Sequence, residues 1–131
     1  MKQIFVILMF LIGISLSAQN NEPITNPDIM PEFQGGPSEM MKFIQTHLKN
    51  PLSLKNDSLS RSCKSMVEFT IDHEGQVKNV FVVRSCMGCN QCDAEAVKVI
   101  EKMPKWKPGI KDKKTVAVKM GLPVFFNLKQ G

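Results

Sequence analysis

The stretch "VEFTIDHEGQVKNVFVV" at residues 67–83 decides the fold. Val67, Phe69 and Ile71 alternate with polar residues, which predicts a strand with one buried face. "DHEGQ" then predicts a turn in which Gly75 supplies the positive φ angle, and the apolar run at 80–83 predicts the return strand. The sequence therefore predicts an antiparallel hairpin at the centre of the domain.

A helix is predicted before this hairpin. Pro37 suits the first turn of a helix, Ser38 is the predicted cap, and Asn50-Pro51 ends the helix. Apolar residues recur at spacings of three and four, which predicts one buried face. That face comprises Met40, Phe43, Ile44, His47 and Leu48.

A second helix and a third strand are predicted after the hairpin. The helix is the stretch "CDAEAVKVIEKMP", which begins at Cys92 and is ended by Pro104. Val97, Ile100 and Met103 are its predicted buried stripe, with Ala96 and Val99 beside it. Alternation from Val116 to about Phe126 predicts one long strand. The expected fold class is α+β, with two helices packed on one face of a three-stranded antiparallel sheet.

The N-terminal residues have the pattern of a secretory signal peptide. Lys2 precedes an apolar run from Ile4 to Leu16, and small residues follow at Ser17 and Ala18. We therefore predict a signal peptide at 1–18, a Pro- and Gly-containing linker at 19–36 and one domain at 37–131. The alternative is an uncleaved anchor in the inner membrane, although the run is shorter than the roughly 20 residues that a spanning helix needs. Either arrangement exports the domain.

Composition and charge argue against several function classes. The formal charge is +5. A run of lysines contributes to it: Lys102, Lys105, Lys107, Lys111, Lys113 and Lys114. Export argues against a nucleic-acid partner, so we interpret this run as a solvated turn, with an acidic partner or an anionic membrane surface as the alternative. Neither histidine has an evident catalytic partner, and Asp93 with Glu95 suits the positive end of a helix. The sequence thus predicts no enzyme, no cofactor and no metal.

Four cysteines remain to be explained: Cys63, and then Cys86, Cys89 and Cys92 in "SCMGCNQCD". If Phe69 and Val80 are opposite partners, paired residue numbers add up to 149. That register pairs Asp72 with Val77 and places Cys63 opposite Cys86. We therefore predict disulfides Cys63–Cys86 and Cys89–Cys92, in keeping with an oxidising compartment.

Other arrangements of the cysteines stay open. Cys63 has Cys89 or Cys92 as alternative disulfide partners. Four thiolates would also suit zinc, and Cys89-Asn90-Gln91-Cys92 is a CxxC pair of the kind used in redox chemistry. The alternative function is therefore an exported cysteine-rich redox or zinc-binding protein.

Together these elements resemble the C-terminal domain of TonB, in the form common in Bacteroidetes-type bacteria. The matching motifs are "PEFQGG" (31–36), Phe43-Ile44, Leu48, Asn50-Pro51, "VEFTIDHEGQV" (67–77), Asp93, Glu95-Ala96, "MPKWKPG" (103–109) and "LPVFFNL" (122–128). They span most of the chain after residue 30, and their order is more specific than any one of them. "MPKWKPG" is expected to be a structural corner, with Trp106 on the core.

The resemblance implies a periplasmic module for energy-coupled transport, which grips an extended segment of outer-membrane receptors by adding it as a strand to an exposed sheet edge. Inner-membrane motor proteins are further partners that it implies. In the family the edge is the last strand, here about Thr115 to Leu122. The implied partner-binding residues are Asn50, Pro51, Thr115, Val116, Ala117, Val118, Lys119 and Met120. An exposed edge would also permit a homodimer.

The chain departs from the family pattern in its linker. The 12 residues from Gln19 to Met30 reach roughly 40 Å even when fully extended, which is short of a periplasm. We therefore expect a stand-alone binding or adaptor module, while a structural module that binds other envelope components is a further alternative. The receptor and its substrate do not follow from the sequence.

Overall fold

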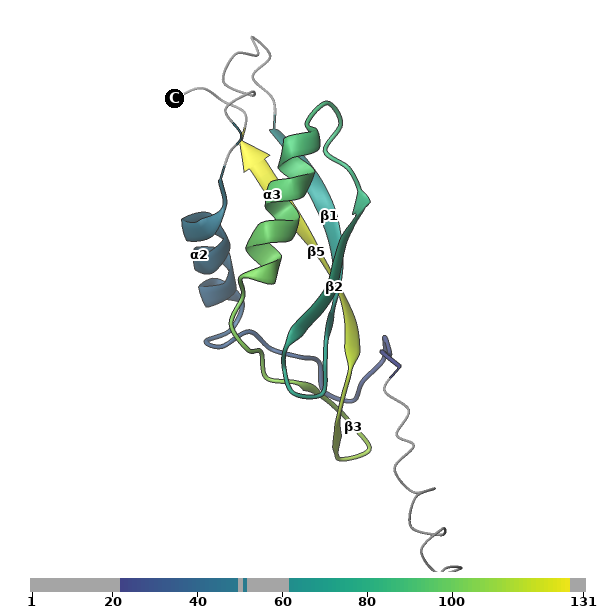
Figure 1. The fold of residues 1–131 in the computed structure, drawn as a ribbon. Coiled ribbons are helices and arrows are strands. Elements are labelled where there is room, and N and C mark those ends of the chain that lie inside the picture. Colours follow the sequence, from purple (N-terminus) through teal and green to yellow (C-terminus); the bar gives the residue numbers. More distant parts are fainter. Residues whose placement is uncertain (1–21, 50, 52–61, 128–131) are drawn as a thin grey trace, which may run out of the picture.

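A computed structural model describes residues 22–49, 51 and 62–127. The elements in chain order are α2 (Pro37–His47), β1 (Ser62–Ile71), β2 (Val77–Arg84), α3 (Asn90–Glu101), β3 (Gly109–Lys111), β4 (Lys114–Val116) and β5 (Val118–Asn127). Three strands form the main sheet in the order β2-β1-β5, with both pairs antiparallel, and β3 and β4 form a separate hairpin (Figure 1). Two helices and three antiparallel strands confirm the α+β composition. The packing of both helices on one face stays a prediction.

β1 is the central strand, and its alternation fits that position. Ser65, Val67, Phe69 and Ile71 are buried, while the residues between them are more exposed, apart from Thr70 near the strand end. β1 pairs with β5 without a break in register, from Ser62 opposite Asn127 to Ile71 opposite Val118. This regular pairing fixes which backbone groups of β5 face outward.

The predicted hairpin register is right only in its middle. Val67 pairs with Val82 and Glu68 with Phe81, and both pairs add up to 149. The register then shifts between Glu68 and Thr70, so Ile71 rather than Asp72 pairs with Val77. Asn79 has a positive φ of 54° at this irregularity, which is a conformation that alternation alone does not reveal.

The N-terminal cap of α2 and the first residue of α3 differ from their predictions. α2 starts at Pro37 as expected, but its N-cap is Gly36 and no side chain caps it, so Ser38 lies inside the helix. α3 starts at Asn90, before the predicted start at Cys92, because the Cys89 sulfur accepts a hydrogen bond from the backbone N–H of Cys92 and caps the helix. Cys92 is therefore part of the buried face of α3.

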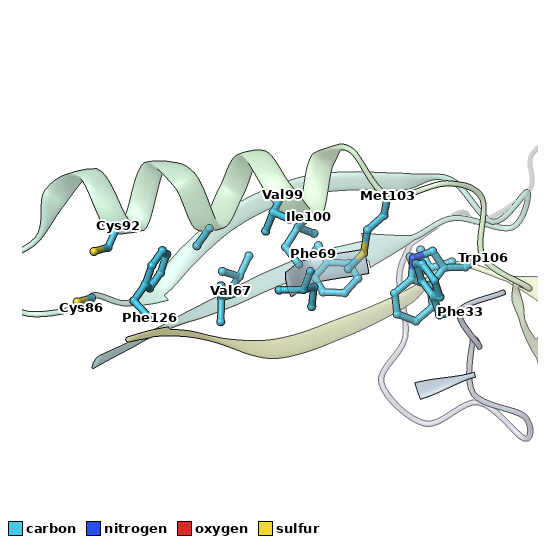
Figure 2. Packing of buried hydrophobic residues seen from close by; sticks show 14 of the residues in the cluster. Phe33, Val67, Phe69, Cys86, Cys92, Val99, Ile100, Met103, Trp106 and Phe126 are labelled. Atoms are coloured by element: carbon cyan, nitrogen blue, oxygen red, sulfur yellow. The ribbon is translucent and has the colours of Figure 1, made fainter. Parts of the chain in front are cut away.

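The core lies between α3 and the sheet (Figure 2). The prediction that Trp106 packs on the core is confirmed, since its side chain is buried against Phe33 and Phe69, with ring centroids 5.6 and 5.8 Å away. Phe33 in turn fastens the "PEFQGG" segment to the core. Among the described residues, Trp106 Nε1 is the one buried side-chain nitrogen or oxygen without a hydrogen-bond partner.

The long strand predicted from Val116 to about Phe126 is found as β5, but its first residue belongs to a separate strand, β4. β4 ends at Val116 and pairs back with β3, while β5 begins at Val118. The tip of the β3–β4 hairpin is Asp112-Lys113, both with positive φ angles of the kind that two-residue hairpin loops require. Because neither residue is glycine, the lysine-rich sequence carries no clear signal for this hairpin turn.

Other predictions fall outside the described part of the chain. These are the signal peptide at 1–18, its cleavage, and Asn50; the domain boundaries stay predictions. Within the described residues, no helix has the length and apolar character needed to cross a membrane.

Candidate binding edge on strand β5

β5 is one of the two edge strands of the main sheet, since β1 pairs with only one of its sides, and β2 is the other edge strand. Ala117 accepts a hydrogen bond and Lys119 donates one on the outer side, so Val118 directs its backbone groups toward β1. Backbone groups alternate along a regular strand. Residues 119, 121, 123 and 125 therefore direct their backbone groups outward.

The first outward position is occupied by the chain itself. Ile24 forms a parallel bridge with Val118: the Ile24 N–H donates to the Ala117 carbonyl at 3.0 Å, and the Lys119 N–H donates to the Ile24 carbonyl at 2.8 Å. This is the bonding pattern of a parallel strand. No periodic pattern predicts this bridge, since the residues on either side of Ile24 are polar or proline.

The segment around Ile24 is also fastened at three later points. Ile29 and Ile110 exchange two backbone hydrogen bonds, of 3.0 and 2.9 Å, and Glu32 and Lys107 exchange two more, of 3.0 and 2.8 Å. The Asp28 carboxylate accepts the Asp112 N–H at 2.9 Å. The segment 24–32 is thus hydrogen-bonded at several points to the 107–119 region.

The predicted partner-binding residues lie in three different environments. Thr115 and Val116 belong to β4 and pair with β3. Ala117 and Lys119 are the two residues that bond Ile24, while Val118 and Met120 pair with Ile71 and Phe69 of β1. Pro51 is buried. The role of all these residues in binding stays a prediction.

The next outward groups along β5 are the Lys119 carbonyl and the N–H and carbonyl of Gly121. In the chain as described, none of them has a hydrogen-bond partner. Pro123 follows at the next outward position and has no N–H to offer, which is typical of an edge strand. Sequence reasoning missed Gly121, although a Gly two residues before a Pro within a strand pattern is itself an edge signal.

An apolar cleft of about 160 Å³ adjoins Gly121. It opens between the end of the N-terminal segment, the start of α2 and strand β5. Its lining includes Phe33, Met40, Trp106, Met120 and Leu122. This edge therefore combines outward backbone groups with an apolar hollow.

Cys86 and Cys92 lie at the other end of the core from Phe33 and Trp106, which line the cleft (Figure 2). Cys63 is joined to Cys86 and Cys89 to Cys92, with Cα–Cα distances of 5.5 and 5.2 Å, which is the pairing favoured by the hairpin register. The sulfur atoms of Cys63, Cys86 and Cys92 lie within 4.8 Å of one another. Zinc binding and thiol chemistry need thiolates, and in this disulfide form none of the four sulfurs is one.

Asp93 ties the start of α3 to the sheet. Its carboxylate accepts hydrogen bonds from the Ser65 hydroxyl at 2.6 Å, from the Cys86 N–H at 3.0 Å and from the Ser85 hydroxyl. Partial burial acts to raise the pKa of Asp93, but the hydrogen bonds from Ser65, Ser85 and Cys86 outweigh it and lower the pKa below its usual value. The network holds the cysteine loop in place.

A comparison with models of protein families identifies the family of this chain. Residues 56–128 match the family model for the Gram-negative bacterial TonB protein C-terminal domain. The match covers more than half of the chain and includes β1, β2, α3, the β3–β4 hairpin and β5. No curated protein matches the chain.

Proposed function

The chain belongs to the TonB C-terminal family, and from this premise we propose that it binds extended segments of outer-membrane receptors by strand addition to β5. The family is a transport-associated, non-enzymatic one of the periplasm, and membership indicates a TonB-like role in energy-coupled transport. The finer proposal concerns the partner and the place where it binds.

One observation supports the place more than any other. The Lys119 carbonyl and both backbone groups of Gly121 face outward beside an apolar cleft. Main-chain groups supply affinity in strand addition, and pockets for alternate side chains supply specificity. Export by the predicted signal peptide would place this edge in the compartment where receptor segments are presented.

The proposal is tested by the pair of variants Gly121→Pro and Gly121→Ala. Proline removes the one outward donor of this stretch and leaves the ladder with β1 intact, whereas alanine keeps the donor and meets no atom within 4 Å. Calorimetry would measure binding of peptides from the N-terminal segments of TonB-dependent receptors. We expect about five-fold weaker binding for Gly121→Pro, since one backbone hydrogen bond contributes about 1 kcal/mol.

Equal affinity of the two variants, or no binding of any receptor peptide to the wild-type protein, would contradict the proposal. Val118→Pro is a poorer test, because the Val118 N–H faces β1 and its loss would damage the sheet itself. The cysteine-based alternative makes the opposite prediction: its activity would depend on Cys89 and Cys92 and be indifferent to Gly121.

A further inference from the structure

Ile24 shows how an added strand sits on this edge. It runs parallel to β5 and lies opposite Val118. Residues that face each other in a sheet direct their side chains to the same face. If an added strand continued past Ile24 in this direction, the second residue after the Ile24 position would lie opposite Met120.

The chain itself does not take that position. Asp28 donates its N–H to the Ile110 carbonyl at 2.8 Å, so the segment has left β5 for β3 within four residues of Ile24. The Lys119 carbonyl and the Gly121 N–H, which would bond a residue opposite Met120, therefore stay unoccupied in the described chain.

The apolar cleft lies at this same position. Met120 and Leu122 line it from β5, and Met40 lines it from α2. A residue opposite Met120 would direct its side chain to the face on which Met120 lies, which is the face of the cleft. The volume of about 160 Å³ suits one aliphatic side chain. The polar side-chain groups among the lining residues are the Glu32 carboxylate and the Trp106 Nε1–H, which has no hydrogen-bond partner among the described residues.

From this geometry we propose that the cleft is a specificity pocket, which takes one aliphatic side chain of a strand running parallel to β5. The partner residue whose side chain enters the pocket lies opposite Met120. Its N–H donates to the Lys119 carbonyl, and its carbonyl accepts the Gly121 N–H. This inference rests on the proposed strand addition and adds the direction, the register and the chemical class of the residue that is recognised.

A minimal probe tests the pocket without any receptor. N-acetyl-leucine N′-methylamide has one aliphatic side chain, flanked by the N–H and carbonyl that the edge requires, and N-acetyl-serine N′-methylamide is its polar control. The full chain would be labelled at its methionine methyl groups and titrated by NMR. Met40 and Met120 report on the cleft, whereas Met41 and Met87 are exposed elsewhere.

We expect saturable shifts of Met40 and Met120 with the leucine probe, and about ten-fold weaker binding of the serine probe. Met40→Trp should fill the cleft and abolish the shift at Met120, while Met41→Trp, the matched change on an exposed neighbour, should keep it. Gly121→Pro supplies a second disruption that leaves α2 unchanged.

Several results would overturn the pocket: no shift with the leucine probe, equal binding of both probes, or an undiminished Met120 shift in both Met40→Trp and Gly121→Pro. Failure of the proposed function is a different result. If the leucine probe binds as expected but no receptor peptide does, the pocket stands and the receptor proposal falls. If receptor peptides bind but their affinity ignores Met40→Trp, the pocket is wrong and strand addition stands.

Discussion

Asp93 shows how one carboxylate can organise the junction between a sheet, a loop and a helix. It accepts hydrogen bonds from Ser65 on β1 and from Ser85 and Cys86 in the loop before α3. Ser65 is fully buried, so the bond to Asp93 also satisfies a hydroxyl that would otherwise be costly. The sequence suggested only a favourable charge at a helix end, which is the smaller part of this role.

The lowered pKa of Asp93 makes a prediction for acid stability. A carboxyl whose pKa is lower in the folded state stabilises the protein above its unfolded pKa of about 3.9, and this contribution is lost as pH falls through the folded value. Asp93→Asn should cost about 1–2 kcal/mol at pH 7, and the difference from wild type should shrink below about pH 4. Urea unfolding between pH 7 and pH 2 measures it; a constant difference would contradict the prediction.

Two glycines of the same chain should respond very differently to alanine. Gly75 has φ of 87°, and an added Cβ would lie 2.0 Å from the Trp106 carbonyl oxygen. The Trp106 N–H also donates to the Gly75 carbonyl at 2.8 Å, so the turn cannot easily move away. Gly75→Ala should cost roughly 2 kcal/mol or more in the free energy of unfolding, and Gly121→Ala less than about 0.5 kcal/mol. Similar losses in thermal or urea unfolding would refute this contrast.

At the scale of elements, the N-terminal segment already forms backbone hydrogen bonds with part of the β5 edge through Ile24. A partner strand that reaches back to Val118 must displace Ile24, whose two backbone bonds compete with it. Ile24→Pro removes the donor to Ala117, while Ile24→Val keeps it. For such a partner we expect about five-fold tighter binding to the proline variant and faster exchange of the Lys119 amide hydrogen, with the valine variant unchanged. Unaltered Lys119 exchange in Ile24→Pro would disprove the role of this bridge.

Elements whose evidence is periodic were predictable, and elements defined by contacts were not. Alternation around Phe69 located β1, and spacing around Ile44 located α2, because burial of one face imposes those periods. The β3–β4 hairpin depends on two non-glycine residues with positive φ, and the Ile24 bridge depends on distant docking through Phe33. Which backbone groups of β5 face outward could be deduced only from the structure, because the hydrogen bonds with Ile24 show on which side Ala117 and Lys119 direct their groups.

At the scale of the whole molecule, the disulfides and the apolar cleft lie at opposite ends of the core. Cys86 and Cys92 are at one end, and Phe33 and Trp106, which line the cleft, are at the other (Figure 2). The Cys63–Cys86 bond encloses the β1–β2 hairpin with a sequence separation of 23, whereas Cys89–Cys92 encloses a separation of 3 within one helix start. The two bonds therefore constrain the unfolded chain very differently.

Removing each pair of cysteines should separate stability from binding. Loop-closure entropy predicts a loss of about 3 kcal/mol for Cys63→Ala with Cys86→Ala and about half that for Cys89→Ala with Cys92→Ala, each measured by urea unfolding. Because the cleft and Gly121 lie at the far end, neither pair should change the affinity for a receptor peptide or the leucine probe by more than about two-fold while the protein is folded. If the disulfides are purely structural, reduction of the wild type should likewise lower stability and leave binding intact. Binding that vanishes with Cys89 and Cys92 in a folded variant would instead place the function at the cysteines and refute the assignment to β5.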